Sequence, residues 1–207
     1  MNIFFDLGAV IIPINFNKTF QSFSTLSGIP VATIGTMYQL HQTDIFQPFE
    51  KGHSGNALFI YQVRELLNLP NSISDIQIVK AWNDLLLPIP PERIERIKEL
   101  RKKHSLYLLS NTNPIHITEV HRILFRSTGV PQLEELFDQT FYSYDINALK
   151  PTEDFYQYVL KNIDAKPKDC YFMDDNSDNI NGSKKCGIES DLITQNFTMM
   201  EATNKYL

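Results

Sequence analysis

The stretch CYFMDDNSDNI, residues 170–180, begins as an apolar strand and ends in crowded acids. Its first four residues form an unbroken apolar run, which is typical of a strand covered on both faces of a sheet. Asp174, Asp175 and Asp178 then follow within five positions, and charges this close repel by about 1 kcal/mol even in bulk water. Either a bound cation or the start of a helix would offset this repulsion.

Segments with strand and helix patterns alternate along most of the chain. We expect strands at residues 2–6, 105–110, 138–144, 169–174 and 189–194. Helices are expected at residues 92–103, 114–125, 151–162 and 178–186, with Pro91 well placed at a helix start. Repeated strand–helix–strand units predict an α/β protein with a doubly wound, mostly parallel, Rossmann-like sheet.

A long helical stretch interrupts this alternation after the first strand. Between residues 14 and 88, apolar and aromatic side chains recur every three or four positions, and prolines at 48, 70 and 88 punctuate the pattern. We therefore expect two domains. Residues 1–13 and 89–207 would form the α/β core, and residues 14–88 an inserted helical cap.

Composition excludes several classes of protein. The chain has 207 residues, 43% hydrophobic and 21% charged, and a net charge of −5, which argues against nucleic acid as a partner. The apolar start, MNIFFDLGAVIIPI, lacks a basic segment and is interrupted by Asp6, so we expect neither a signal peptide nor a membrane span. Cys170 and Cys186 lack paired spacing. Together these features predict a cytoplasmic protein with reduced cysteines.

Chemically suggestive residues follow four of the predicted strands. In open α/β sheets, ligands bind beyond the carboxyl ends of the strands. Each such residue alone could be a turn residue or a cap, but all of them share one edge of the predicted sheet and so indicate a site. Besides the acids at 174–178, they are Asp6 and Gly8 in FFDLG, Ser110 and Asn111 in LLSNTN, and Lys150 in ALKPTEDF.

Four segments resemble the sequence motifs of the haloacid dehalogenase superfamily of hydrolases. They are FFDLGAV, LLSNTN, LKPTEDFYQYVL and YFMDDNSDN, in family order, with a helical cap after the first. The resemblance covers nearly the whole chain and is strongest to small, sugar-phosphatase-like members. It implies a phosphatase that uses Mg²⁺ and acts on a small phosphorylated metabolite, such as a sugar phosphate.

The resemblance also implies roles for the acids. Asp6 would attack phosphorus and form an aspartyl-phosphate. Mg²⁺, which prefers oxygen ligands, would be held by Asp6, Asp175 and the carbonyl of Gly8. Asp174 would act through water or by orienting Asp175. The positive charges of Mg²⁺ and of Lys150 together would offset the repulsion among the acids at residues 174–178.

Other positions are implied to hold the phosphate or to flank the site. Ser110 and the N–H group of Asn111 would contact phosphate oxygens, and Lys150 would balance the charge of nucleophile and phosphate. The family's last acid falls at Asn179 in this chain, and Asp178 lies one position earlier. Asp178 either belongs to the site or caps the following helix. Asn113, before Pro114, is expected to be a cap.

The chain departs from the commonest phosphatase pattern at Gly8. Phosphatases of the family usually carry a second aspartate there, which protonates the leaving group and then activates water. Glycine cannot carry a proton, and general acid–base help is worth about 10²–10⁴-fold in rate. Two alternatives stay open, a non-catalytic protein that binds a phosphorylated metabolite for regulation and a metal-independent 2-haloacid dehalogenase. The paired Asp174 and Asp175 argue against the dehalogenase.

The cap offers little information about the substrate. FEKGHSG, residues 49–55, could approach the phosphate, with Glu50, Lys51 and His53 as polar candidates, but an exposed loop with a glycine turn is the interpretation we favour. Trp82 is expected to belong to the core of the cap. The sequence does not assign an oligomeric state.

Overall fold

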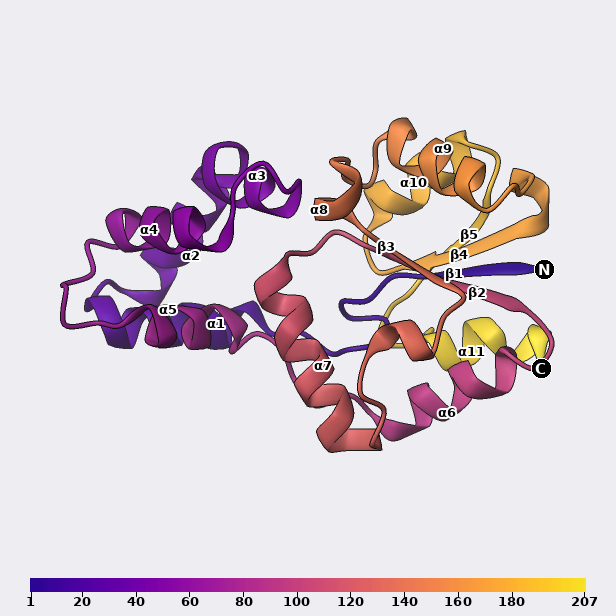
Figure 1. Ribbon diagram of the computed structural model, residues 1–207, viewed down its shortest axis with the longest axis horizontal. Coiled ribbons are helices and arrows are strands. Elements are labelled where there is room, and N and C mark those ends of the chain that lie inside the picture. The colour runs from indigo at the N-terminus through magenta and orange to yellow at the C-terminus, as the bar shows by residue number, and fades with distance from the viewer.

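A five-stranded, wholly parallel sheet forms the centre of the larger part of the molecule (Figure 1). The computed structural model describes all residues, 1–207. The strand order is β3-β2-β1-β4-β5, which confirms the predicted doubly wound topology. The strands are β1 (Asn2–Phe5), β2 (Ser105–Ser110), β3 (Gln139–Tyr142), β4 (Cys170–Asp174) and β5 (Glu189–Leu192).

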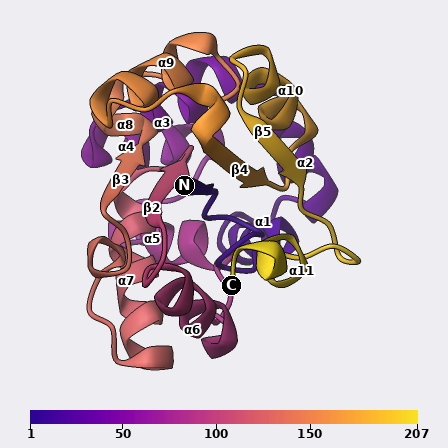
Figure 2. The same ribbon diagram turned by 90° about the vertical axis from the view of Figure 1, so that its right-hand side faces the viewer.

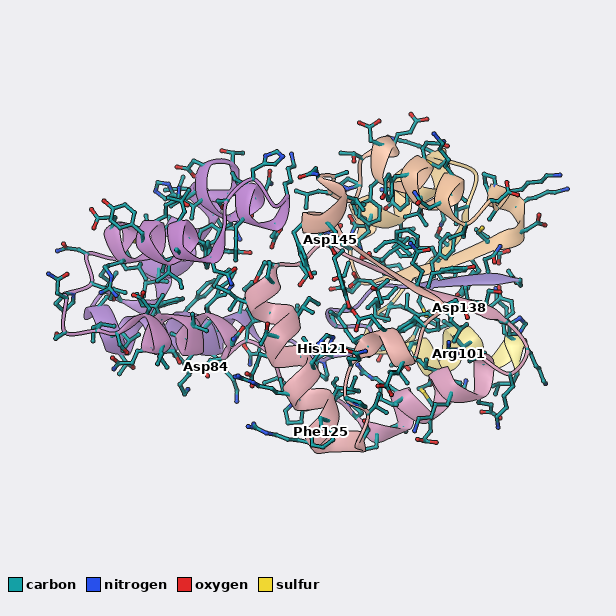
Figure 3. All side chains as sticks on the ribbon, viewed as in Figure 1. Asp84, Arg101, His121, Phe125, Asp138 and Asp145 are labelled. Atoms are coloured by element: carbon teal, nitrogen blue, oxygen red, sulfur yellow. The ribbon has the colours of Figure 1, made fainter.

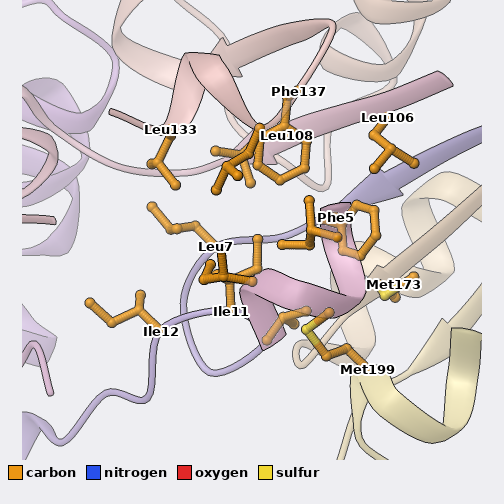
Figure 4. Close-up of a cluster of buried hydrophobic side chains, with 14 of the residues drawn as sticks. Phe5, Leu7, Ile11, Ile12, Leu106, Leu108, Leu133, Phe137, Met173 and Met199 are labelled. Atoms are coloured by element: carbon orange, nitrogen blue, oxygen red, sulfur yellow. The ribbon is translucent and has the colours of Figure 1, made fainter. Parts of the chain in front are cut away.

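Helices cover both faces of this sheet, as the unbroken apolar strands require (Figures 1 and 2). One face packs against α6 (Pro91–Leu100), α7 (Pro114–Thr128) and α11 (Met199–Thr203). The other face packs against α9 (Glu153–Asn162) and α10 (Ser177–Lys185). Side chains of β1 alternate between the two faces of the sheet. Ile3 and Phe5 belong to the hydrophobic cluster on one face, and Phe4 belongs to the cluster on the other. Figure 4 shows Phe5 beside Leu108 and Phe137 in the first of these clusters.

The predicted strand at 138–144 proved too long. β3 ends at Tyr142, and the chain turns at once into the short helix α8 (Ser143–Ile146). The reason is a side-chain contact that no periodicity reveals, because the buried hydroxyl of Ser143 both accepts a bond from the N–H of Thr112 and donates to its carbonyl. This exchange ties the loop after β2 to the end of β3.

The helical segment after β1 forms a unit beside the sheet (Figure 1) and packs around an aromatic core. Trp82 lies at its centre, 3% exposed, within 5.5 Å of the Phe46 ring and 5.2 Å of the Phe59 ring, so its predicted core position is confirmed. We continue to assign this unit to a cap at residues 14–88. Its helices are α1 (Phe16–Ser27), α2 (Val31–Leu40), a π-helical turn (Gln42–Phe46), α3 (Gln47–Glu50), α4 (Asn56–Leu66) and α5 (Asp75–Asn83).

Helix starts follow the predicted signals with one exception. Pro91 is the first residue of α6, and the side chain of Asn113 caps α7 by accepting a bond from the N–H of His116. Helix α10, however, is capped by Asn176, whose Oδ1 accepts the N–H of Asp178. The interpretation of Asp178 as the cap is therefore wrong. Asp178 is an exposed residue of the first turn, where its charge complements the helix dipole.

The tip of the helical unit touches the core at α8. Gly52 lies against the carbonyl of Tyr144 so closely that a Cβ there would overlap this oxygen, and its φ of +73° also favours glycine. Asp145, also on α8, lies on the side of the core that faces α3 (Figure 3). The two units are thus in contact in this structure. Elsewhere, Cys170 and Cys186 are free thiols, and none of the helices has the length and apolar character to cross a membrane.

Candidate active site

Three carboxylates meet at the carboxyl end of the two central strands. Asp6 follows β1, and Asp174 and Asp175 end and follow the neighbouring β4. One oxygen atom of each lies within 4.8 Å of one oxygen atom of the others. We call Asp6, Asp174 and Asp175 the acidic cluster. The parallel register, which pairs Phe5 with Met173, produces this proximity of residues far apart in the sequence.

Lys150 lies inside the acidic cluster. Its Nζ donates to Asp6 Oδ1 and Asp174 Oδ2, both at 2.6 Å, and to the carbonyl of Leu109 at 2.8 Å. The side chain is fully buried. Burial lowers the pKa of Lys150, but the charges of Asp174 and Asp6 outweigh burial and the net pKa is raised. All three N–H donors of the ammonium group are therefore in use, and a direct bond to phosphate would replace one of them.

Asp174 is fully satisfied by its neighbours. Oδ1 accepts from the N–H of Asn176 at 2.8 Å and from Asn179 Nδ2 at 3.1 Å, and Oδ2 accepts from Lys150 and from Asn179 Nδ2 at 3.0 Å. Three donor atoms thus share the two oxygens of Asp174, which leaves it less free than Asp6 or Asp175 to bind a cation. Asp174 therefore contacts Lys150, Asn176 and Asn179, and its predicted role toward Asp175 stays a prediction. These bonds also give Asn179 the task of fixing Asp174.

Asp6 and Asp175, by contrast, keep free oxygen atoms. Asp6 Oδ2 has no hydrogen-bond partner, and the exposed carboxyl of Asp175 bonds to no other residue. The carbonyl of Gly8 accepts a single bond, from the N–H of Val10 at 2.6 Å, which leaves a second lone pair. Burial raises the pKa of Asp6, and Asp174 and Asp175 add to the rise against the effect of Lys150. Burial and then Asp174 raise the pKa of Asp175.

This donor set fits a magnesium ion. Two carboxylates and one carbonyl are hard oxygen ligands, the type that Mg²⁺ selects, and an exposed edge leaves room for the waters that it keeps. A cation there would also lower the raised pKa values of Asp6 and Asp175. The predicted ligands Asp6, Gly8 and Asp175 are thus the groups of this site with unused oxygen lone pairs.

Asn111 fixes the loop that carries Lys150. Its Nδ2 donates to the carbonyl of Lys150 and its Oδ1 accepts the N–H of the same residue, both at 2.9 Å. Both polar atoms of its side chain are therefore engaged in hydrogen bonds. The predicted contact with phosphate is made by the backbone N–H of Asn111 and does not need this side chain. Close packing holds the same loop from the other side. In α10, a Cβ at Gly182 would come within 2.4 Å of the carbonyl oxygen of Pro151.

A cavity of about 100 Å³ is lined by Leu7 and Gly8, which follow Asp6 directly in the chain. Gly8, Ser110 and Asn111 line it from the core, so the structure brings these predicted residues together around one space. Neither Lys150 nor any residue of the acidic cluster is among the lining residues. The remaining wall includes Thr112, His116 and Val120 of the core and Phe16, Tyr38, Glu50 and Trp82 of the helical unit.

Sequence reasoning missed part of this wall. The expected exposed loop at residues 49–55 holds for His53 but not for Glu50, which is half-buried and faces the cavity. His116, which has no acid or histidine at ligand spacing, is placed by structure alone. Its Nδ1 lies 2.8 Å from Asn83 Oδ1, and its ring stacks on Trp82 with centroids 4.8 Å apart.

A larger groove, of about 800 Å³, lies between α1, α5 and α7. Its charged side chains include Lys80 with Asp84 and Arg122 with Glu119, which form ion pairs within their own helices. None of the predicted site residues lines this groove. The smaller cavity is therefore the candidate substrate site.

Comparison with known proteins shows which family the chain belongs to. A family model for haloacid dehalogenase-like hydrolases matches residues 4–187. The chain is 32% identical over 189 residues to the D-ribitol-5-phosphate phosphatase of Bacteroides thetaiotaomicron, covering 91% of this chain and 89% of that protein.

Two solved structures have the same fold. One is a haloacid dehalogenase family enzyme of B. thetaiotaomicron in complex with magnesium and inorganic phosphate, with a TM-score of 0.84, 30% identity and 93% of each chain covered. The other is a predicted hydrolase of this type from Porphyromonas gingivalis, with a TM-score of 0.81, 27% identity and coverage of 92% of this chain and 89% of that one. The chain belongs to the haloacid dehalogenase-like hydrolases.

Proposed function

We propose that the protein is a Mg²⁺-dependent phosphatase of a small phosphorylated metabolite and works through an aspartyl-phosphate. The observation that carries this proposal is the arrangement of the acidic cluster around Lys150. Asp6 is held on one oxygen at 2.6 Å by Lys150 and keeps the other free. A positioned carboxylate with one free oxygen is suited to nucleophilic attack.

In this proposal each residue of the site has a distinct task. Asp6 attacks phosphorus, and Lys150 holds the Asp6 carboxyl in place and favours its ionised form. Ser110 and the N–H of Asn111 bind phosphate oxygens at the cavity wall. Asp6, Asp175 and the Gly8 carbonyl would hold Mg²⁺, which supplies charge stabilisation for the transferring phosphoryl group. Asp174 and Asn179 fix Lys150 and take no direct part.

The cavity supports a small substrate. Its volume of about 100 Å³ is below the range of about 300–1,000 Å³ of pockets that bury drug-sized ligands. Its wall combines aromatic carbons with polar atoms of Glu50, His116 and Thr112. A sugar phosphate or an open-chain polyol phosphate suits such a wall, and the similarity to a D-ribitol-5-phosphate phosphatase supports this substrate class.

Gly8 motivates the second candidate function, a non-catalytic protein that binds a phosphorylated metabolite. Such a binding protein would use the same phosphate site as the phosphatase but would not hydrolyse the metabolite. The metal-independent dehalogenase has less support, because Asp175 adds a second unpartnered carboxyl beside Asp6. Without a cation, this carboxyl would only add repulsion.

Phosphate release tests the proposal. With D-ribitol 5-phosphate, sugar phosphates and phenyl phosphate as substrates, we expect turnover with Mg²⁺ and at least about 10²-fold less with a chelator, because the acidic cluster loses its counter-charge. Asp175→Asn should lower the affinity for Mg²⁺, so that more Mg²⁺ is needed for turnover. Asp178→Asn changes an exposed neighbour outside the donor set and should leave this affinity unchanged. Metabolite binding without turnover would favour the binding protein, and turnover that is unchanged by chelator would contradict the metal site.

A further inference from the structure

The structure leaves open which group protonates the leaving oxygen. Gly8, at the usual position of the acid, has no side chain. Departure of an alkoxide from phosphorus without a proton is slow, and general acid catalysis is worth about 10²–10⁴-fold. A replacement acid must lie in the wall of the cavity, hold a proton near neutral pH, and be free of other hydrogen-bond partners.

Only three residues that line the cavity have side chains that titrate: Tyr38, Glu50 and His116. Burial, and then the charge of Glu50, raises the pKa of Tyr38 to about 12, so its phenol is a weak acid at neutral pH. Burial lowers the pKa of His116 to about 3. Its imidazole is therefore neutral, and its single proton lies on Nδ1, in the bond to Asn83 Oδ1.

Glu50 meets all three requirements. Glu50 lines the cavity, and its carboxyl has no hydrogen-bond or ion-pair partner within the protein. Loss of hydration raises its pKa to about 7, with no contribution from a neighbouring charge. An unpaired, partly buried carboxyl costs free energy, and a carboxyl poised near pH 7 in a cleft is a typical proton donor.

The backbone around Glu50 is firmly held. The preceding Phe49 is 1% exposed and stacks on Phe59 with centroids 4.0 Å apart. Gly52, two residues later, lies against the carbonyl of Tyr144 in the core. Glu50 is thus fixed on a segment that is anchored in the helical unit and in contact with the core.

No neighbouring charge contributes to the pKa of Glu50. Lys51 follows Glu50 in the chain, and α4 carries Arg64, which is paired with Asp75. Tyr38 faces Glu50 from α2, the turn before α3 carries Asp44, and α8, which packs on α3, carries Tyr144 and Asp145. Asp44 is occupied by His41, 2.8 Å away. This environment favours the protonated form of the carboxyl, the form that an acid catalyst needs.

We propose that Glu50 is the general acid of the reaction, in place of the side chain that Gly8 lacks. As Asp6 bonds to phosphorus, the bond from phosphorus to the leaving oxygen breaks, its electron pair stays on that oxygen, and the Glu50 carboxyl donates its proton there. Water then adds to phosphorus and breaks the bond to Asp6, and the proton released by water returns to Glu50. This inference rests on the proposed phosphatase function.

The test compares two substrates of similar size that differ in leaving group, phenyl phosphate and para-nitrophenyl phosphate. Nitrophenolate departs without a proton, whereas phenolate is helped by one. Glu50→Gln keeps the shape of the side chain and removes the proton. We expect kcat/KM for phenyl phosphate to fall about 10²-fold and kcat/KM for para-nitrophenyl phosphate to change little.

The pH dependence provides a second readout. Because an acid must be protonated, kcat/KM of the wild type for phenyl phosphate should fall as the pH rises above about 7. This fall should disappear in Glu50→Gln. Glu65→Gln, an exposed carboxyl on α4, is the matched control and should leave both substrates unaffected.

Each outcome has one meaning. A selective loss with phenyl phosphate supports Glu50 as the acid. An equal loss with both substrates, or none, overturns it even though the wild type is active. A wild type that hydrolyses neither substrate nor any other phosphate ester contradicts the phosphatase itself. Thermal unfolding of Glu50→Gln at the wild-type temperature excludes misfolding as a cause of lost activity.

Discussion

Lys150→Met is expected to lower the free energy of unfolding by about 3–5 kcal/mol at neutral pH, because it leaves a buried charge without its partner. The substitution removes the one cation between Asp6 and Asp174 and also the donor to the carbonyl of Leu109. The remaining carboxylates face each other in a buried site. Phosphatase activity should be lost as well.

The loss of stability should depend on pH with a definite sign. Burial already raises the pKa of Asp6, and removal of Lys150 raises it further. The folded variant then retains a proton that the unfolded chain has released, so the stability of the variant falls as the pH rises above the unfolded pKa of Asp6. Its deficit against the wild type should be smaller at about pH 5 than at about pH 8.

Chemical denaturation at both pH values, with chelator present, measures this effect. Lys161→Met, an exposed lysine of α9, is the control and should cost less than about 0.5 kcal/mol. A Lys150→Met variant as stable as this control would show that the buried ion pairs do not hold the site together.

Gly8→Asp is expected to restore proton transfer. The backbone at residue 8 has no positive φ, and a Cβ there would meet only Ile14 and Asp6 Oδ2, at 3.6 Å and 4.0 Å. A Cβ therefore fits without strain and lies beside the nucleophile. In the Glu50→Gln background, we expect kcat/KM for phenyl phosphate to rise about 10²-fold, the lower limit of general acid catalysis.

Gly8→Ala in the same background is the control, since it adds the Cβ but no proton. It should give no gain. Equal activities of the Gly8→Asp and Gly8→Ala variants would show that proton donation does not limit the reaction. Denaturation should reveal a modest loss of stability in Gly8→Asp, because another carboxylate joins the acidic cluster.

Much of the fold was predictable because parallel strands buried on both faces have simple sequence patterns. The unbroken apolar runs at β1, β2 and β4 identified the sheet, and the polar residues after them identified its functional edge. Asn113 as a cap and Pro91 as a first helical residue followed from local backbone chemistry. The extent of the cap, residues 14–88, and the roles of the site residues stay predictions.

The features that sequence reasoning missed depend on contacts between distant segments. Glu50 resembles a loop residue until α3 packs against α8, and His116 acquires its fixed tautomer only from Asn83 on another helix. Likewise, Asn176 caps α10 in place of Asp178, and because Asn and Asp are both favoured at helix starts, residue type does not distinguish them. Local sequence patterns do not predict contacts of this kind.

The most direct test of the account is detection of phosphate on Asp6 during turnover. The enzyme is mixed with phenyl phosphate and Mg²⁺, quenched in acid within milliseconds, digested, and analysed by mass spectrometry. The account predicts one added phosphoryl group on the peptide that contains Asp6, and none in Asp6→Asn. Phosphate release without any phosphoryl group on Asp6, or with one on another residue, would contradict Asp6 as the nucleophile.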